Sequence, residues 1–117
     1  YQHNAFRSPG AAPIEVLNET PYKANYFANL YSKMHKRVVP HSMYVGESNI
    51  DVLSGFNFVF ICIDDGPSRK KIVEFLERVG ASFIDTGLGI NAVDEALIGT
   101  VRATTSRPQQ RDHLTPR

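Results

Sequence analysis

The stretch CIDDGPSRKKIVEFL, residues 62–76, decides the fold prediction. The apolar residues 58–63 lead into it, and a short apolar run bounded by turn residues is typical of a strand buried on both faces. Two carboxylates, Asp64 and Asp65, follow this run, and Pro67 suits the first turn of a helix. The stretch therefore predicts a buried strand followed at once by a helix, with charged side chains at the junction.

Helices alternate with short apolar strands on both sides of this junction. A helix is predicted to begin at Thr20-Pro21, because threonine is a good N-cap and proline suits the first turn. Further predicted elements are strands at residues 38–45, 82–85 and 96–104, and a short helix that the capping-box pattern Ser48 to Asp51 opens and Gly55 ends. Such alternation implies right-handed crossovers and a mostly parallel sheet, so the predicted fold class is α/β.

Composition divides the chain into three parts. Residues 1–19, which contain Pro9, Gly10 and Pro13, are predicted to be an irregular arm. Residues 20–106 form the α/β domain, and residues 107–117 form a polar tail. Doubly wound nucleotide-binding folds open with a strand and a glycine-rich phosphate turn, which nothing before Thr20 resembles. We therefore expect a partial Rossmann-like fold with flanking helices that lacks the N-terminal glycine-rich nucleotide-binding half.

Charge and composition argue against several classes of function. The net charge is +1, so no strong field attracts nucleic acid or an anionic membrane. No apolar run approaches the roughly 20 residues that a membrane-spanning helix needs. The single cysteine, Cys62, allows no internal disulfide and no cysteine-based zinc cluster, which suits a cytoplasmic protein. Because Cys62 lies within the apolar run, we expect it to be a packed core thiol.

The carboxylates after the apolar run are the first candidates for chemistry. Ligands of open α/β sheets bind at the carboxyl ends of the strands, where a carboxylate can hold Mg²⁺ against a phosphate. Asp65 is better explained as the N-cap of the following helix. For Asp64 two interpretations stay open: a ligand of this kind, or a side chain whose charge Arg69 and Lys70 merely offset.

Three further residues suit a phosphate. Lys23 lies in the first turn of the helix expected from Thr20, where the helix dipole opposes a lysine by about 0.3–1 kcal/mol. A helix start with a lysine makes a good phosphate site, but a solvated lysine is the simpler explanation at so small a cost. Asn4 and Arg7 lie on the arm. An arginine on an ordered arm can bind phosphate through two hydrogen bonds, whereas a lone loop arginine is usually just solvated.

Taken in order, these segments resemble the adenylation domain of the ThiF/MoeB/HesA family, whose fold is shared with ubiquitin-activating enzymes. HNAFR, residues 3–7, is similar to the family's Asn-x-x-Arg segment, and ETPYKANYFANLY, residues 19–31, to the start of its Gly-Lys-Pro-Lys-Ala helix. VFICIDDGPSRKKI, residues 59–72, resembles its Asp-Asn-x-x-x-Arg turn, with Arg69 on the arginine. LIGTVRATT, residues 97–105, is similar to the family strand with a Gly-x-Val pattern.

The resemblance implies a role for each matching residue. The family binds ATP and Mg²⁺ and adenylates the C-terminal glycine of a ubiquitin-like or sulfur-carrier protein, and its members tend to form homodimers. By this analogy Asn4 and Arg7 contact the phosphates. Lys23 stabilises the charge that builds up on them, and Asp64 positions Mg²⁺. Arg7, Lys23 and Asp64 are therefore the expected catalytic residues.

The chain departs from the family pattern at several points. The glycine-rich ATP loop and the acidic residue for the ribose are missing, and Asp65 replaces the usual asparagine. Thr20-Pro21-Tyr22 lacks the family's first lysine, and no Cys-x-x-Cys pair or candidate thioester cysteine is found. We therefore expect a fragment that is inactive alone and belongs to a longer, active enzyme. Two alternatives stay open: a non-catalytic interaction or dimerisation domain of this fold, and another Rossmann-type nucleotide-binding fragment.

Overall fold

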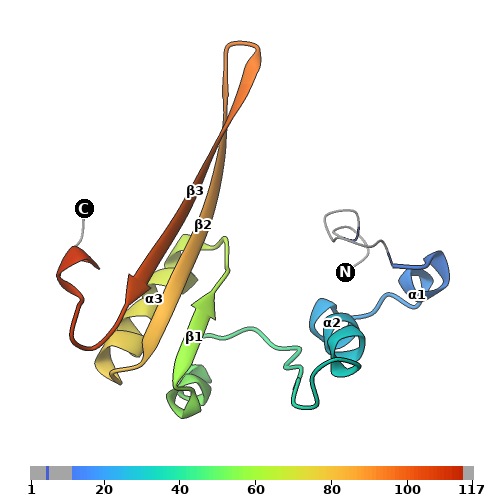
Figure 1. Cartoon of the computed structure of the whole chain (residues 1–117), viewed down its shortest axis with the longest axis horizontal. Helices are drawn as coiled ribbons and strands as arrows, with labels where there is room; N and C mark the ends of the chain where they lie inside the picture. The colour runs from blue at the N-terminus through green and yellow to red at the C-terminus, as the bar shows by residue number, and fades with distance from the viewer. Residues whose placement is uncertain (1–4, 6–11, 115–117) are drawn as a thin grey trace. The chain divides into compact units, whose positions relative to one another are not determined.

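The computed structural model describes Ala5 and residues 12–114 (Figure 1). The chain divides into two compact units, with the boundary between Tyr44 and Val45. Among the helices that the structure describes, none is both long enough and apolar enough to cross a bilayer.

Two helices form in the first unit. α1 spans Ile14–Asn18, so the prediction of an irregular arm is wrong for these five residues. α2 spans Lys23–Ser32 with Tyr22 at its N-cap, and it starts later than predicted. Thr20 cannot cap α2 because it takes part in the turn after α1: its φ is 49° and its N–H donates to the Leu17 carbonyl at 3.0 Å.

The prediction of a strand at residues 38–45 is wrong. In the described part of the chain this segment is irregular and belongs to no sheet. Pro40 offers no N–H to a ladder, and the side chains of Val39 and Tyr44 are exposed. Apolar residues alone therefore do not make a strand here, because no neighbouring strand pairs with them.

The second unit contains the sheet. Its elements are η2 (Ile50–Gly55), β1 (Phe58–Ile61), α3 (Gly66–Arg78), β2 (Ser82–Val93), β3 (Ala96–Ser106) and η3 (Asp112–Leu114). The strand order is β1-β2-β3; β1 runs parallel to β2, and β2 runs antiparallel to β3. The α/β class is thus confirmed, whereas the prediction of a mostly parallel sheet is wrong because the described sheet is mixed.

The short helix before the sheet differs in detail from its prediction. η2 is a 3₁₀ helix with Asn49 at its N-cap and no capping hydrogen bond from a side chain. The expected capping box opened by Ser48 is therefore not formed. Asn49 Oδ1 instead accepts a hydrogen bond from the Gly46 N–H at 2.8 Å, which fixes the turn before the helix.

A long hairpin replaces the short strand expected at residues 82–85. β2 continues through Gly87 and Gly89 to Val93, so the glycines lie inside a strand and not in a loop. Two residues, Asp94 and Glu95, connect it to β3, and Asp94 has a φ of 53°. Asp tolerates this left-handed conformation better than most residues, and two-residue hairpin turns commonly require it.

α3 follows its local signals closely. The carboxylate of Asp65 accepts a hydrogen bond from the Ser68 N–H at 2.8 Å, so its predicted role as N-cap is confirmed. At the other end Gly80 has a φ of 72°, and the N–H groups of Gly80 and Ala81 donate to the carbonyls of Glu77 and Leu76. This is the Schellman arrangement, which satisfies the last carbonyls of a helix.

α3 covers one face of the sheet. The buried core consists of Ile61, Ile72, Phe75, Leu76, Ala81 and Phe83. Leu76 and Phe83 are fully buried, and they join the inner side of α3 to the inner face of β2. The core therefore lies between one helix and the β1 end of the sheet.

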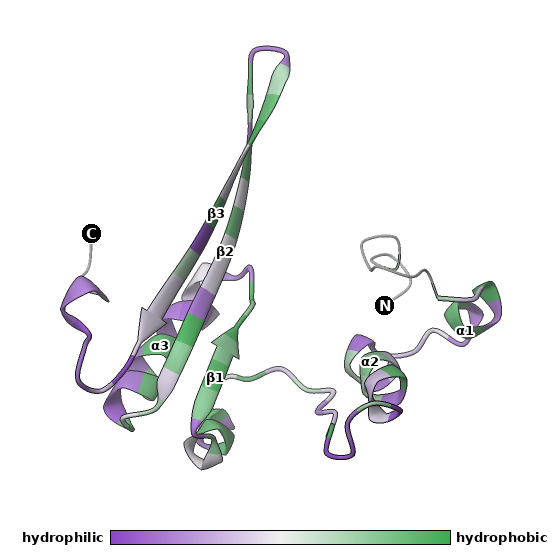
Figure 2. Ribbon diagram, viewed as in Figure 1, coloured by the Kyte–Doolittle hydropathy of each residue, from purple (hydrophilic) through white to green (hydrophobic). Residues whose placement is uncertain are grey.

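The opposite face, here the outer face, is defined by six exposed apolar residues: Phe58, Phe60, Leu88, Ile90, Leu97 and Val101. They share a face because side chains alternate along a strand and paired positions, such as Leu88↔Val101, point the same way. Figure 2 shows the hydrophobic colour on β1 and along the hairpin. The prediction that β1 is buried on both faces is therefore wrong: α3 covers one face, and no described element of the second unit covers the other.

The described part of the polar segment after Ser106 packs against the second unit. Arg111 Nη2 donates a hydrogen bond to the Ala81 carbonyl at 2.8 Å. His113 Nε2 lies 2.6 Å from the Thr105 carbonyl oxygen. These contacts attach the segment to β3 and to the turn after α3.

Candidate functional site

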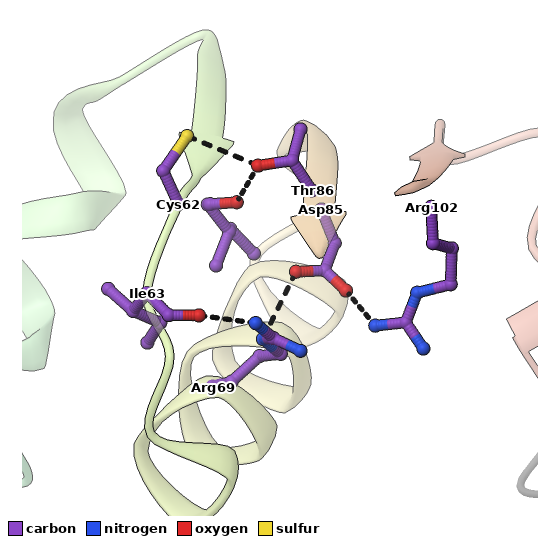
Figure 3. A network of polar contacts seen from close by, with 7 residues as sticks. Cys62, Ile63, Arg69, Asp85, Thr86 and Arg102 are labelled. Carbon is purple, nitrogen blue, oxygen red and sulfur yellow. Dashed lines mark hydrogen bonds and ion pairs between the residues drawn. The ribbon is translucent and has the colours of Figure 1, made fainter. Parts of the chain in front are cut away.

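The junction between β1 and α3 is the candidate site, and side chains hold its backbone. β1 pairs with β2 only as far as Ile61↔Asp85, so the sheet does not hold the backbone beyond that point. The Thr86 hydroxyl lies within hydrogen-bond distance of the Ile61 carbonyl oxygen (3.1 Å) and of Cys62 Sγ (3.3 Å). Arg69 Nη2 donates a hydrogen bond to the Ile63 carbonyl (Figure 3).

Cys62 is exposed, so the expectation of a packed core thiol is wrong. Along β1 the side chains alternate between the two faces, and Ile61 is the last one that points into the core. The next residue therefore belongs to the uncovered side. Its contact with Thr86 makes Cys62 part of the polar junction and not of the hydrophobic core.

A buried carboxylate lies between two arginines beside this loop. Asp85 is only 7% exposed. Its Oδ1 lies 3.4 Å from Arg69 Nε, and its Oδ2 accepts a hydrogen bond from Arg102 Nη2 at 3.0 Å (Figure 3). The first contact has the distance of an ion pair but not the geometry of a hydrogen bond, since neither atom has a hydrogen-bond partner in the described part. Arg69 thus joins the Ile63 carbonyl to the Asp85 carboxylate.

Gly87 lies beside this cluster. It pairs with Arg102 across the hairpin. A Cβ atom at Gly87 would lie 3.5 Å from Arg102 Nη2 and 3.8 Å from Arg69 Nη1, both ordinary contact distances. Both guanidinium groups therefore lie near the Gly87 backbone without requiring a glycine there.

The cations near Asp64 have other partners. Neither Arg69 nor Lys70 forms an ion pair with Asp64, because Arg69 pairs with Asp85 and Lys70 with Glu74 at 3.8 Å, and both interpretations of Asp64 stay predictions. Asp64 is exposed and makes no hydrogen bond or ion pair with another described residue. Its carboxylate is therefore available to a ligand.

The neighbouring carboxylate is in use. The Ser68 side chain and N–H both stabilise ionised Asp65, and these hydrogen bonds hold the pKa of Asp65 below its ordinary value. The two adjacent aspartates thus differ in role: Asp65 caps α3, whereas Asp64 takes no part in the cap.

A surface ion pair joins α3 to the turn before η2. Lys71 Nζ and Glu47 Oε1 are 2.5 Å apart, and both side chains are well exposed. The contact lowers the pKa of Glu47 and raises the pKa of Lys71. Because solvent screens exposed pairs, its contribution to stability is small.

The other predicted site residues lie elsewhere. Lys23 is the first residue of α2 and is exposed, so its predicted place in the first turn is confirmed. It belongs to the first unit and Asp64 to the second, and the catalytic role that the resemblance implies for both stays a prediction. Asn4 and Arg7 lie outside the described residues.

The donor set fits one metal arrangement and not others. The described residues contain no group of three or more His, Cys, Asp or Glu that could hold a metal ion. Mg²⁺, however, is commonly bound by one or two carboxylates together with waters and substrate phosphates. The carboxylate of Asp64, which has no partner among the described residues, suits that arrangement.

Sequence reasoning missed three residues of the junction: Asp85, Thr86 and Arg102. An aspartate within a short apolar strand is the one signal that could have found Asp85, because a buried carboxylate requires a cationic partner. Arg102 could be matched to it only through the antiparallel register of the hairpin.

No family model, curated protein or solved structure matches the chain. The likeness to ThiF/MoeB/HesA adenylation domains therefore depends on the motif segments alone and stays a prediction from the sequence.

Proposed function

We propose that this chain supplies the phosphate-side part of a cytoplasmic ATP-dependent adenylyltransferase that activates the C-terminus of a ubiquitin-like or sulfur-carrier protein. One observation carries the proposal. Between β1 and α3, Ile61 and Ile63 are held through their carbonyls and Asp65 through its side chain, while the carboxylate of Asp64 is exposed and unpaired among the described residues. A carboxylate held in this way at the carboxyl end of a parallel strand suits a ligand site.

The chemistry of adenylyl transfer fits these residues. Bound Mg²⁺ would neutralise charge on the ATP phosphates. Asp64 would provide one ligand oxygen to that ion. The motif resemblance implies that Lys23, the first residue of α2, stabilises charge on the phosphates, and the start of a helix suits a phosphate. Asn4 and Arg7 would add further phosphate contacts, as the motif resemblance implies.

The test is Mg²⁺-dependent ATP–pyrophosphate exchange with the protein expressed from its full gene. The acceptors are purified ubiquitin-like and sulfur-carrier proteins that end in glycine. We expect Lys23→Ala and Asp64→Asn to slow exchange on the order of tens- to thousands-fold, because each removes transition-state charge stabilisation. Lys33→Ala, at the exposed C-cap of α2, and Asp51→Asn, at an exposed position of η2, are the matched controls and should leave it unchanged. Unchanged exchange in both site variants, or none in the wild type with any acceptor, would overturn the proposal.

The outer face favours a second candidate, a non-catalytic interaction or dimerisation domain. Contiguous exposed apolar surface marks an interaction site in soluble proteins. Under this reading the chain forms a homodimer through the outer face of its hairpin. Sedimentation at micromolar concentration should then show a dimer that Leu88→Lys with Val101→Lys dissociates. Thr100→Lys, on the opposite face of the hairpin, should not dissociate it, and a monomeric wild type would rule this candidate out.

A further inference from the structure

The carbonyl immediately before Asp64 is held by a side chain. Because the β1–β2 ladder ends at Ile61, no strand holds the Ile63 carbonyl. Arg69 Nη2, from the second turn of α3, donates to it instead. The position of the Asp64 backbone thus depends on where the guanidinium of Arg69 is held.

Asp85 determines that position. It lies on β2 in register with Ile61, the last residue of β1, so the sheet fixes the place of its carboxylate. Its Oδ1 faces Arg69 Nε at 3.4 Å, while Nη2 of the same guanidinium reaches the Ile63 carbonyl. A planar guanidinium can make both contacts at once, whereas the ammonium group of a lysine cannot.

The two arginines that contact Asp85 differ in how far their side chains are buried. The side chains of Asp85 and Arg69 are 10% and 23% exposed, whereas that of Arg102 is 58% exposed. Charge pairs shielded from water interact more strongly than solvated ones. Asp85 and Arg69 therefore form the principal pair, and Arg102 supports Asp85 from the solvent side.

We propose that Arg69 and Asp85 are positioning residues for Asp64. Asp85 holds the guanidinium of Arg69, and Arg69 holds the Ile63 carbonyl, so the carboxylate of Asp64 is presented at one place. The identity of what Asp64 binds rests on the proposed function, but the positioning itself does not. Outer groups that orient a metal ligand typically change metal affinity by 10–100-fold when they are removed.

The experiment compares two variants of the pair with two controls. Asp85→Asn keeps the shape and removes the charge, and Arg69→Lys keeps the charge but loses the double contact. Arg102→Gln should have a smaller effect than either. Lys70→Ala removes an exposed neighbour that pairs only with Glu74 among the described residues, and it should have none. If Asp85→Asn does not fold, Arg69→Lys still provides the test, because it leaves Asp85 a cationic neighbour.

The first readout needs no activity. Amide ¹⁵N relaxation of the labelled protein should give an order parameter near 0.85 for Asp64 in the wild type. Both pair variants should lower it to below about 0.6, while values within α3 stay unchanged. Unchanged order at Asp64 in both variants would overturn the proposal, whatever happens to global stability.

The second readout separates metal affinity from turnover. With Mn²⁺ as the probe metal, the concentration for half-maximal ATP–pyrophosphate exchange should rise about tenfold in both pair variants, with the rate at saturating metal nearly unchanged. A purely structural pair would instead lower the maximal rate and leave the metal requirement alone, which would contradict positioning. If the wild type shows no exchange but the order parameters fall as expected, the positioning stands and the proposed function fails.

Discussion

The two ends of β2 differ in how completely the molecule itself covers them. At the first end, Phe83 to Asp85 pair with both β1 and β3, and Phe83 and Asp85 are buried beneath α3. At the second end, from Leu88 to Val93, the strand pairs with β3 alone and its side chains are exposed. Strand pairing and side-chain burial therefore change sharply along a single strand.

This difference indicates which parts of the chain are self-sufficient. A two-stranded ribbon by itself is marginally stable in water, and the exposed apolar outer face adds no stability while it stays uncovered. The junction end has a buried core, a capped helix and a loop between β1 and α3 whose backbone is bound by side chains. We therefore expect the junction to behave as a fixed site and the distal hairpin to behave as a surface that gains from being covered.

The largest contrast should come from one leucine at each end. Leu76 is fully buried in the core and Leu88 is exposed on the outer face. Leu76→Ala should lower the free energy of unfolding by about 3 kcal/mol, through lost burial and the cavity left behind. Leu88→Ala should change it by less than about 0.5 kcal/mol. Urea denaturation measures both, and equal losses would show that the hairpin face is covered in solution.

Asp85 provides the next contrast. Asp85→Ala leaves the partly buried guanidinium of Arg69 without its carboxylate, and we expect a loss on the order of 2 kcal/mol, below the range for fully buried pairs because Arg69 is partly solvated. The matched control is the exposed Asp51, where alanine should have little effect. A loss at Asp85 no greater than at Asp51 would mean that the cluster contributes nothing to the junction.

Local signals predicted the self-sufficient end better than the rest. The helix over Gly66–Arg78 could be predicted because its start and stop depend on neighbouring residues, namely Asp65, Pro67 and Gly80. The hairpin could not, because the strand character of Gly87 and Gly89 depends on pairing with β3.

The candidate site shows the same limit. Asp64 could be singled out because it directly follows the apolar run at residues 58–63. Its support could not, because Arg69 and Asp85 meet only after β1, α3 and β2 have packed. Burial of Cys62 was predicted from its apolar neighbours, but the short β1 ladder and the uncovered outer face decide its exposure.

A smaller effect concerns how the stability of the protein depends on pH. The pKa of Asp65 is lower in the folded state than its ordinary value of 3.8. The ionised cap therefore stabilises the protein fully at pH values above 3.8. This contribution is lost as the pH falls through the lower pKa of the folded state. Asn caps a helix about as well without titrating. The stability advantage of the wild type over Asp65→Asn should therefore be constant above pH 5 and shrink below pH 3.8. Urea midpoints at several pH values measure it, and a pH-independent difference would contradict the capping account.

The central claim is that two adjacent aspartates have separate roles, and one paired measurement tests it. The melting temperature and the ATP–pyrophosphate exchange rate are measured for Asp64→Asn and Asp65→Ala in the protein expressed from its full gene. We predict that Asp64→Asn keeps the melting temperature and loses exchange, because its carboxylate supports no described contact. Asp65→Ala should lower the melting temperature and keep most of the exchange at temperatures where the protein stays folded. The reverse pattern, or exchange that follows only the melting temperature in both variants, would contradict the account.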